Sequence, residues 1–171
     1  MNKLRISKAL QFIILMLFFS VIGIIPKSFA DTVNSTIEIM PDGSIYPDDA
    51  PLQRHGNIYT LTEDIEVVSD GISIAKDDIV IDGAGYTILG RGIKTGIIIG
   101  AYAPANAGRQ NVTIKNLNLI NFQCGIRLDN SSNNMISNCT LAKNPWGIEI
   151  GFYSDYNQII QNQITHFSVG I

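Results

Sequence analysis

The chain has 171 residues, of which 46% are hydrophobic, and its formal net charge is −3. This length suits a single domain. All fifteen acidic residues follow residue 30, whereas only eight of the twelve basic residues do, so residues 31–171 carry a formal charge of −7. That acidic balance excludes the basic stripe typical of nucleic-acid-binding proteins, and we expect no nucleic-acid partner.

Residues 1–30 have the pattern of a secretory signal peptide. A basic start precedes an apolar stretch at residues 9–25, and small residues at Ser28 and Ala30 suit cleavage by signal peptidase. The alternative is an uncleaved membrane anchor, because the apolar stretch approaches the length of a bilayer span. Both interpretations predict an exported protein, secreted or on the extracellular cell surface, with a periplasmic or pseudoperiplasmic location as a further option.

Residues 31–110, which precede the three clear repeats, divide into a segment without the repeat, two weaker repeat units and an inserted loop. Residues 31–57 are rich in proline and glycine and lack the repeat, so we predict an N-terminal cap over an otherwise open end. Repeats are expected over residues 58–171, with weaker units at residues 59–74 and 78–99. An alanine-rich stretch at residues 100–110 is predicted to be a loop inserted between repeats.

Internal self-similarity is the strongest signal in the chain. Three sets of like residues recur with the same steps of 22 and then 23 residues. The sets are Ile114, Ile136 and Ile159; Leu119, Leu141 and Ile164; and Gly125, Gly147 and Gly170. Three ladders that share one single-residue insertion indicate a solenoid of repeated structural units.

The spacing of apolar residues within each unit predicts strands. Apolar and polar residues alternate at Leu117–Leu119 and Ile126–Leu128, and clusters of Asn, Ser, Asp and Gly separate such runs. A unit of 22–23 residues buries its apolar face only by stacking on its neighbours. We therefore predict an all-β, right-handed, single-stranded parallel β-helix in which these three ladders are structural.

The C-terminal end lacks a capping unit. The chain stops at Ile171, two residues into a predicted strand. Because a solenoid needs an atypical terminal repeat, we expect a C-terminally incomplete fragment of a longer product. Self-association through the open end is the alternative.

The sequence bears on two kinds of covalent modification, disulfide formation and glycosylation. Cys124 and Cys139 fall at different positions around the coil, so we expect two buried thiols and no disulfide. N-x-S/T sequons occur at Asn34, Asn111, Asn130 and Asn138. If the host glycosylates proteins, outward loops favour Asn34 and Asn130, whereas the repeat places Asn138 beside the core.

Several stretches resemble the NosD-type β-helix family. The stretches are Ile79–Ile88, Asn111–Asn116 and, similar to the start of many archaeal members, Asp42–Thr62. The resemblance extends over residues 37–171 and implies an exported parallel β-helix of the kind also found in carbohydrate-binding and sugar-hydrolysis domains. It is specific for the fold and not for an activity, since this fold supports lyases, hydrolases, binding proteins and passive surface proteins.

The carboxylates do not predict a hydrolytic pair, and we name no catalytic residue. Glycoside hydrolysis needs two carboxyl groups across a bond, and the outward candidates are Asp82, Asp129 and Glu149. Glu149 aligns with Arg127, which predicts a surface ion pair between adjacent coils. Asp82 precedes a glycine and is expected to hydrogen-bond the local backbone.

We predict neither a metal site nor a cofactor. Asp77, Asp78 and Asp82 lack the spacing of a calcium loop. The available copper ligands are scattered: His55, Met135, Cys139 and His166. His166 is aligned with Lys143 and Ile120 and is interpreted as a variable turn residue.

Aromatic residues provide the candidate binding site. Trp146, Phe152, Tyr153 and Tyr156 lie around one predicted turn and its flanks, where they suit stacking on the sugar rings of a polysaccharide or cell-surface glycan. The alternative is that Trp146 and Phe152 cover the core. Tyr102 lies in the inserted loop.

Three functional hypotheses remain open. The first is a non-catalytic surface or secreted β-helix that binds glycans or acts as a structural scaffold. The second is a fragment of a polysaccharide lyase or hydrolase whose active site lies outside this chain. The third is a NosD-like accessory role in copper-enzyme maturation, as the resemblance implies.

Overall fold

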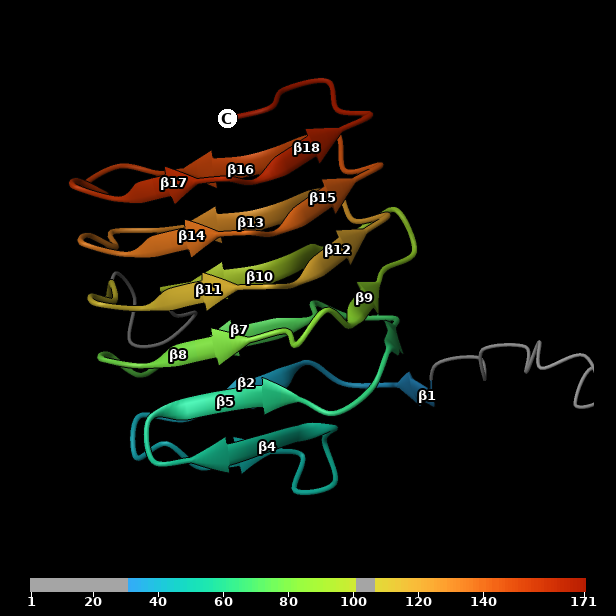
Figure 1. Ribbon diagram of the computed structural model, residues 1–171, viewed down its shortest axis with the longest axis vertical. Coiled ribbons are helices and arrows are strands. Elements are labelled where there is room, and N and C mark those ends of the chain that lie inside the picture. The colour runs from blue at the N-terminus through green and yellow to red at the C-terminus, as the bar shows by residue number, and fades with distance from the viewer. Residues whose placement is uncertain (1–30, 101–106) are drawn as a thin grey trace, which may run out of the picture.

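The computed structural model describes residues 31–100 and 107–171, in which every regular element is a β-strand (Figure 1). The predicted signal peptide or anchor at residues 1–30 and most of the predicted inserted loop, including Tyr102, lie outside the described residues. In the part of the chain that is described, no helix is long and apolar enough to span a membrane.

The strands form three six-stranded sheets, here called sheets A, B and C. Sheet A has the order β1 (Asp31–Val33), β6 (Ile65–Val67), β9 (Thr87–Leu89), β12 (Asn118–Ile120), β15 (Thr140–Ala142) and β18 (Gln163–Thr165). Sheet B has the order β16 (Trp146–Ile150), β13 (Cys124–Leu128), β10 (Thr95–Ile99), β7 (Ile72–Ile74), β2 (Ile37–Ile39) and β3 (Ile45–Tyr46). Sheet C has the order β17 (Gln158–Ile160), β14 (Met135–Ser137), β11 (Thr113–Lys115), β8 (Val80–Asp82), β5 (Ile58–Leu61) and β4 (Leu52–His55).

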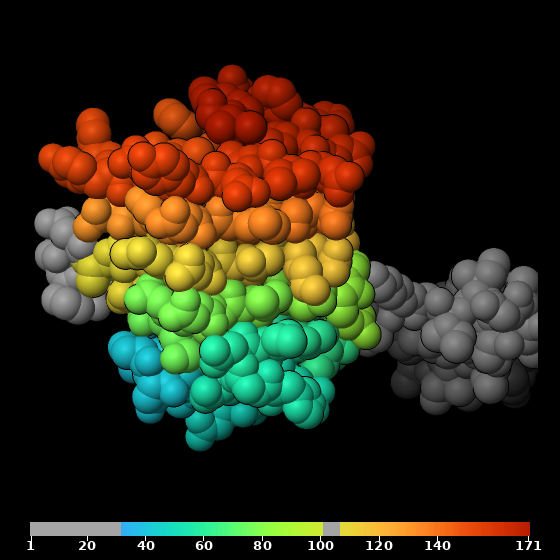
Figure 2. Space-filling model, turned by 60° about the vertical axis from the view of Figure 1, so that its left-hand side comes forward, coloured from blue at the N-terminus to red at the C-terminus, as the bar shows by residue number. Residues whose placement is uncertain are grey.

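The chain visits the three sheets in turn, so each coil stacks on the one before it, as Figure 2 shows in sequence order from blue to red. The predicted ladders are in register. Ile114 pairs with Ile136 and Ile136 with Ile159 in sheet C, while Leu119 pairs with Leu141 and Leu141 with Ile164 in sheet A. The predicted steps of 22 and 23 residues are therefore confirmed, and with them the parallel β-helix.

A continuous apolar core fills the space between the sheets. Inward residues alternate with outward ones, as in β7, where Ile72 and Ile74 are fully buried and Ser73 is partly exposed. Ile81 and Ile88, predicted to point inward, are also fully buried. Each such isoleucine contributes on the order of 2 kcal/mol by leaving water. The stack therefore supplies the stability that a single coil lacks.

A column of glycines runs through sheet B at Gly71, Gly96, Gly125, Gly147 and Gly170. A Cβ added to Gly125 would lie 2.5 Å from the carbonyl oxygen of Gly147, and one added to Gly147 would lie 2.4 Å from that of Gly170. No real Cβ tolerates such contacts. The predicted glycine ladder is thus required by the close approach of consecutive coils.

The corners of the coil contain residues in the left-handed backbone region. One corner column consists of Asn121, Lys143 and His166, with φ values of 62°, 57° and 56°. His166 therefore aligns with Lys143 and Asn121, and the predicted alignment with Ile120 was wrong by one residue. Asn138 occupies another such corner with its side chain exposed, so the prediction that it lies beside the core was also wrong; Cys139 points inward instead.

Residues 31–57, expected to form a cap without the repeat, contain both parallel and antiparallel strands. Strands β1 and β2 pair in parallel with β6 and β7, as the strands of a coil do. Strands β3 and β4 run antiparallel to β2 and β5 and end the sheets. The turn between β2 and β3 is held against β4 and β5, because Arg54 Nη1 and the Tyr59 hydroxyl both donate to the Gly43 carbonyl, at 2.7 and 2.8 Å.

The two cysteines are free and buried at different positions around the coil. Cys124 begins β13 in sheet B, whereas Cys139 lies in the turn between β14 and β15. The expectation of two separate thiols therefore agrees with the structure.

Candidate functional site

A groove of about 260 Å³ lies on the outward face of sheet B. It is lined by Thr95, Gln123, Cys124, Arg127, Trp146 and Glu149. Strands β13 and β16 supply most of this lining, because their register places Cys124 beside Trp146 and Arg127 beside Glu149. The groove therefore combines one large aromatic side chain with charged and amide groups.

The glycine column explains why sheet B is hollowed here. Gly125 and Ile126 both face the interior, since a Cβ on Gly125 would meet the Leu141 side chain at 2.6 Å and Ile126 is fully buried. Two consecutive inward residues break the usual alternation of a strand. As a result Cys124 and Arg127, three residues apart, share the outward face, and Trp146 and Glu149 do the same one coil later.

Arg127 is the electrostatic centre of the groove. Its Nε lies 2.9 Å from a carboxylate oxygen of Asp129 and 3.9 Å from one of Glu149. Partial burial works against its charge, but the two carboxylates outweigh burial and raise the pKa of Arg127 above its ordinary value. The predicted pair with Glu149 is present, while Asp129, for which no partner was predicted, makes the closer contact.

Cys124 at the edge of the groove is not a nucleophile. Burial, followed by the nearby charge of Glu149, raises the pKa of the Cys124 thiol from 9.0 to about 12. A thiol with so high a pKa stays protonated at physiological pH and lacks the thiolate that reacts. Cys124 therefore serves as a small, weakly polar wall.

Trp146 contributes an exposed ring to the groove. It is the sole tryptophan of the chain, and 44% of its surface is accessible. The rest of its surface is buried, so its place in the groove lining is compatible with the alternative that its ring also covers part of the core.

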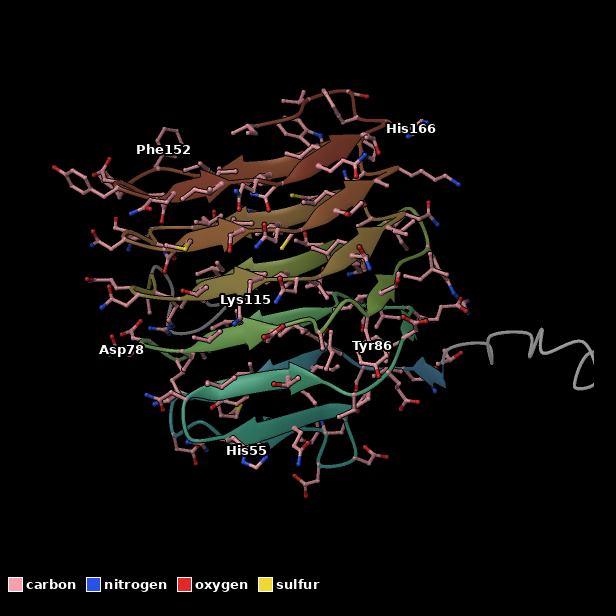
Figure 3. All side chains as sticks on the ribbon, viewed as in Figure 1. His55, Asp78, Tyr86, Lys115, Phe152 and His166 are labelled. Carbon is pink, nitrogen blue, oxygen red and sulfur yellow. The ribbon has the colours of Figure 1, made fainter. Side chains whose placement is uncertain are left out.

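The other three candidate aromatics lie together on the turn between β16 and β17. Phe152, Tyr153 and Tyr156 are 90%, 82% and 84% exposed. Figure 3 shows Phe152 projecting away from the ribbon, so the interpretation that it covers the core was wrong. We call these three residues the aromatic turn.

Two residues of the aromatic turn occupy strained backbone positions. Tyr153 and Tyr156 have φ values of 57° and 56°, in the left-handed region that asparagine and glycine tolerate best. One coil earlier the equivalent positions are Asn130 and Asn133. The step of 23 residues aligns these asparagines with the tyrosines, so the replacement of asparagine by tyrosine at two corners could have been found from the sequence. The strain itself is shown only by the backbone angles.

Trp146 and the aromatic turn are neighbours without forming one cluster. Trp146 begins β16, and the turn follows its last residue, Ile150. At 3.3 Å per residue the five-residue strand is about 13 Å long. The four predicted binding residues therefore form two separate groups at the two ends of one strand.

Asp82 lies away from the groove in sheet C and has a local structural role. Its carboxylate accepts a hydrogen bond from the Ala84 N–H at 2.9 Å, as expected, and one from Asn116 Nδ2 at 3.1 Å. Lys115 Nζ lies 3.1 Å from the other oxygen. Burial raises the pKa of Asp82, but these partners together outweigh it and lower the pKa below 3.8.

Among the described residues, no group of three or more His, Cys, Asp or Glu side chains is arranged to hold a metal ion. Asp77 accepts the Gln110 N–H, and Asp78 accepts a hydrogen bond from Asn111. The two histidines lie at opposite ends of the stack, His55 at the end of β4 and His166 after β18 (Figure 3).

A second hollow, of about 500 Å³, lies near the N-terminal end and was not predicted. Its lining includes Asn34, Asp49 and Glu63 together with Pro47 and Pro51, and it holds no aromatic side chain. It offers carboxylates without a stacking surface, so the groove on sheet B is the better candidate site.

Three parallel sheets wound coil upon coil, with a shallow groove on one outer face, define the class of protein as a parallel β-helix. Residues 105–171 match a family model described as a right handed beta helix region. No curated protein and no solved structure matches the chain with significance. The chain is therefore a right-handed parallel β-helix, and the family match supports the fold without naming an activity.

Proposed function

We propose that this protein is an exported, non-catalytic β-helix that binds a polysaccharide or cell-surface glycan. The observation that carries the proposal is the aromatic turn, in which three large rings are exposed to solvent at the opposite end of β16 from Trp146. Flat aromatic rings offer apolar faces that pack against the apolar faces of sugar rings, and their few rotatable bonds keep the cost of ordering them low.

The backbone strain supports a role in binding rather than in folding. Each tyrosine in the left-handed region costs on the order of 1 kcal/mol compared with asparagine or glycine. The preceding coil shows that asparagine fits at both positions. A bulky, exposed residue that lowers stability and covers no core is consistent with selection for contact with a ligand.

The experiment substitutes Tyr153→Asn and Tyr156→Asn together, copying Asn130 and Asn133 of the coil before. Isothermal titration calorimetry against a panel of soluble polysaccharides should show binding by the unmodified protein and at least tenfold weaker binding by the double variant. Thermal unfolding should show the variant to be at least as stable, because the strain is relieved. Equal binding by both proteins would contradict the proposed role of the turn.

Export is the second part of the proposal and rests on the pattern of residues 1–30. Expression in a secreting host, followed by mass spectrometry of the protein recovered outside the cytoplasm, gives the N-terminus directly. A mature chain that begins at Asp31 is expected for signal-peptide cleavage, and an intact N-terminus in the membrane fraction would indicate the anchor. Recovery from the cytoplasm alone would contradict export.

The enzymatic alternative has one observation in its favour. Asp129 and Glu149 both approach Arg127 Nε, at 2.9 and 3.9 Å, so their near oxygens lie within the upper limit of about 9.5 Å between the two carboxyl groups of a glycosidase. However, both carboxylates are ion-paired with the guanidinium, whereas glycoside hydrolysis needs one of the two protonated. We therefore favour binding, and release of reducing sugar from any polysaccharide of the panel would reverse that choice.

A further inference from the structure

We infer that the groove on sheet B holds one neutral pyranose ring of the polysaccharide, and that Trp146 forms the stacking wall of this subsite. The inference deepens the proposed function and depends on it for the class of ligand. It assigns a second position for a sugar ring, separate from the aromatic turn, and it gives that position a preference for uncharged sugars.

The dimensions of the groove fit a single ring. Trp146 and Glu149 share the outward face of β16 three residues apart, which corresponds to about 10 Å along the strand. A sugar ring placed between them would have one face toward the indole and its hydroxyl edge toward the ion pair. The carboxylate of Glu149 accepts hydrogen bonds from hydroxyls, and the amide of Gln123 both donates and accepts them.

The lining has the character of a ligand site rather than of an ordinary sheet face. Binding sites combine an apolar or aromatic surface with a few polar groups that point to the same place. Here each of two adjacent strands has two consecutive inward residues, Gly125 and Ile126 in β13 and Gly147 and Ile148 in β16, and four of the six lining residues come from these strands. The same close packing that stabilises the coils therefore shapes the groove.

The charges of the groove determine which sugar it accepts. Arg127 is paired with two carboxylates, so the trio of Arg127, Asp129 and Glu149 carries a net charge of −1. A uronate in the groove would bring another carboxylate beside Glu149, while Asp129, which is not part of the lining, already occupies Arg127, and like charges repel. Neutral hexose or pentose rings meet no such penalty.

The sole tryptophan makes this site directly observable. Because Trp146 lines the groove, its fluorescence reports occupation of this subsite and not of the aromatic turn. We expect a saturable change in emission when the protein is titrated with at least one neutral hexasaccharide of a panel of cello-, manno-, laminari- and xylo-oligosaccharides. Oligogalacturonate of the same length should bind at least tenfold more weakly.

Matched variants separate stacking from fluorescence. Trp146→Phe keeps a ring and should retain calorimetric affinity within about threefold, whereas Trp146→Ala should lose at least tenfold. Glu149→Gln keeps the shape of the side chain and removes its negative charge. This variant should therefore show a smaller difference in affinity between neutral and acidic oligosaccharides. The double variant Tyr153→Asn/Tyr156→Asn serves as the control that leaves the groove intact.

The outcomes distinguish the two proposals. If neutral oligosaccharides bind by calorimetry while Trp146 emission stays constant and Trp146→Ala binds normally, the subsite is overturned and the proposed function stands. If emission saturates and the tyrosine variant binds normally, the groove is supported and the aromatic turn is not. Equal affinity for oligogalacturonate would overturn the charge preference, and no binding of any saccharide would overturn both proposals.

Discussion

Asparagine has two distinct roles in the coils, depending on where its side chain points. Inward asparagines join one coil to the next: Asn134 accepts the Val112 N–H at 2.9 Å and donates to the Arg109 carbonyl at 3.1 Å. Outward asparagines, such as Asn116 and Asn121, occupy left-handed corners where their short side chains cause little strain. The same residue type therefore provides both the turns and the bonds between coils.

Asn144→Ala tests the inward role. Asn144 is fully buried, accepts the Phe122 N–H at 2.8 Å and donates to the Leu119 carbonyl at 3.0 Å. Its removal leaves a buried donor and a buried acceptor without partners, so the free energy of unfolding should fall by about 2–4 kcal/mol in urea denaturation. Asn118→Ala is the control, since Asn118 Nδ2 bonds the Gly85 carbonyl near the surface, and it should cost less than about 1 kcal/mol.

The thiol of Cys124 predicts a loss of stability at alkaline pH. Unfolded thiols ionise near pH 9.0, whereas burial raises the pKa of folded Cys124 to about 12. Between these values the unfolded chain binds fewer protons than the folded one, so the free energy of unfolding falls as the pH rises. From pH 9 to pH 10.5 the loss due to this thiol should be about 2 kcal/mol.

Urea denaturation at both pH values, with Cys124→Ala as the comparison, isolates this effect from the titration of lysine and tyrosine. The variant should lose about 2 kcal/mol less than the unmodified protein. Identical pH profiles for the two proteins would show that Cys124 is not buried in the manner described.

At the scale of the elements, the strands of sheet B differ from those of sheets A and C. In the later coils they are five residues long rather than three, and each contains a glycine whose added Cβ would clash with a backbone carbonyl of the next coil. This glycine allows two consecutive residues to face inward, so that residues three apart share the outward face that lines the groove. Sheet B therefore combines a structural requirement with the candidate site.

Gly125→Ala tests the close approach. The added Cβ would lie 2.5 Å from the Gly147 carbonyl oxygen, and neither backbone can move without disturbing the stack. We expect a loss of about 3 kcal/mol or failure to fold. Gly85→Ala is the matched control: Gly85 has φ +84° but nothing within 4 Å of the new Cβ, so only the backbone strain of about 1 kcal/mol remains. A similar loss in both variants would contradict the packing explanation.

Much of the arrangement of the strands was predictable from the sequence. The ladders of Ile114, Leu119 and Gly125 and the position of Cys124 beside Trp146 all follow from counting residues between repeats. The weak points were the corners, where a shift of one residue misplaced Ile120 and Asn138. Corners lack the two-residue alternation that fixes strand register, so their alignment depends on backbone angles that sequence does not display.

At the scale of the whole molecule, contacts connect mainly neighbouring coils, as expected of a solenoid. Ile126 in β13 pairs with Ile97 below it and Ile148 above it. Ile126→Ala should therefore create a local cavity costing about 2–4 kcal/mol. Hydrogen exchange measured by mass spectrometry should show faster exchange in β10, β13 and β16 and unchanged exchange in β5. A uniform increase along the chain would indicate that the stack unfolds only as a single cooperative unit.

The sequence by itself determined the solenoid, its repeat length, its inward ladders and the separation of the two thiols. Stacked coils require like residues at like positions, so the fold is visible in the sequence as residues that recur at a fixed spacing. It also indicated an exported protein and drew attention to Trp146, Phe152, Tyr153 and Tyr156. The tertiary structure alone decided which of these belong together. Trp146 joins Arg127 and Glu149 in a groove because the glycines of sheet B let two consecutive residues face inward, and the two tyrosines are strained because the corner forces φ to positive values. The repeat period specifies which residues stack. The close approach of the coils and the backbone angles, which arise only when the coils pack, specify what their outer surface can bind.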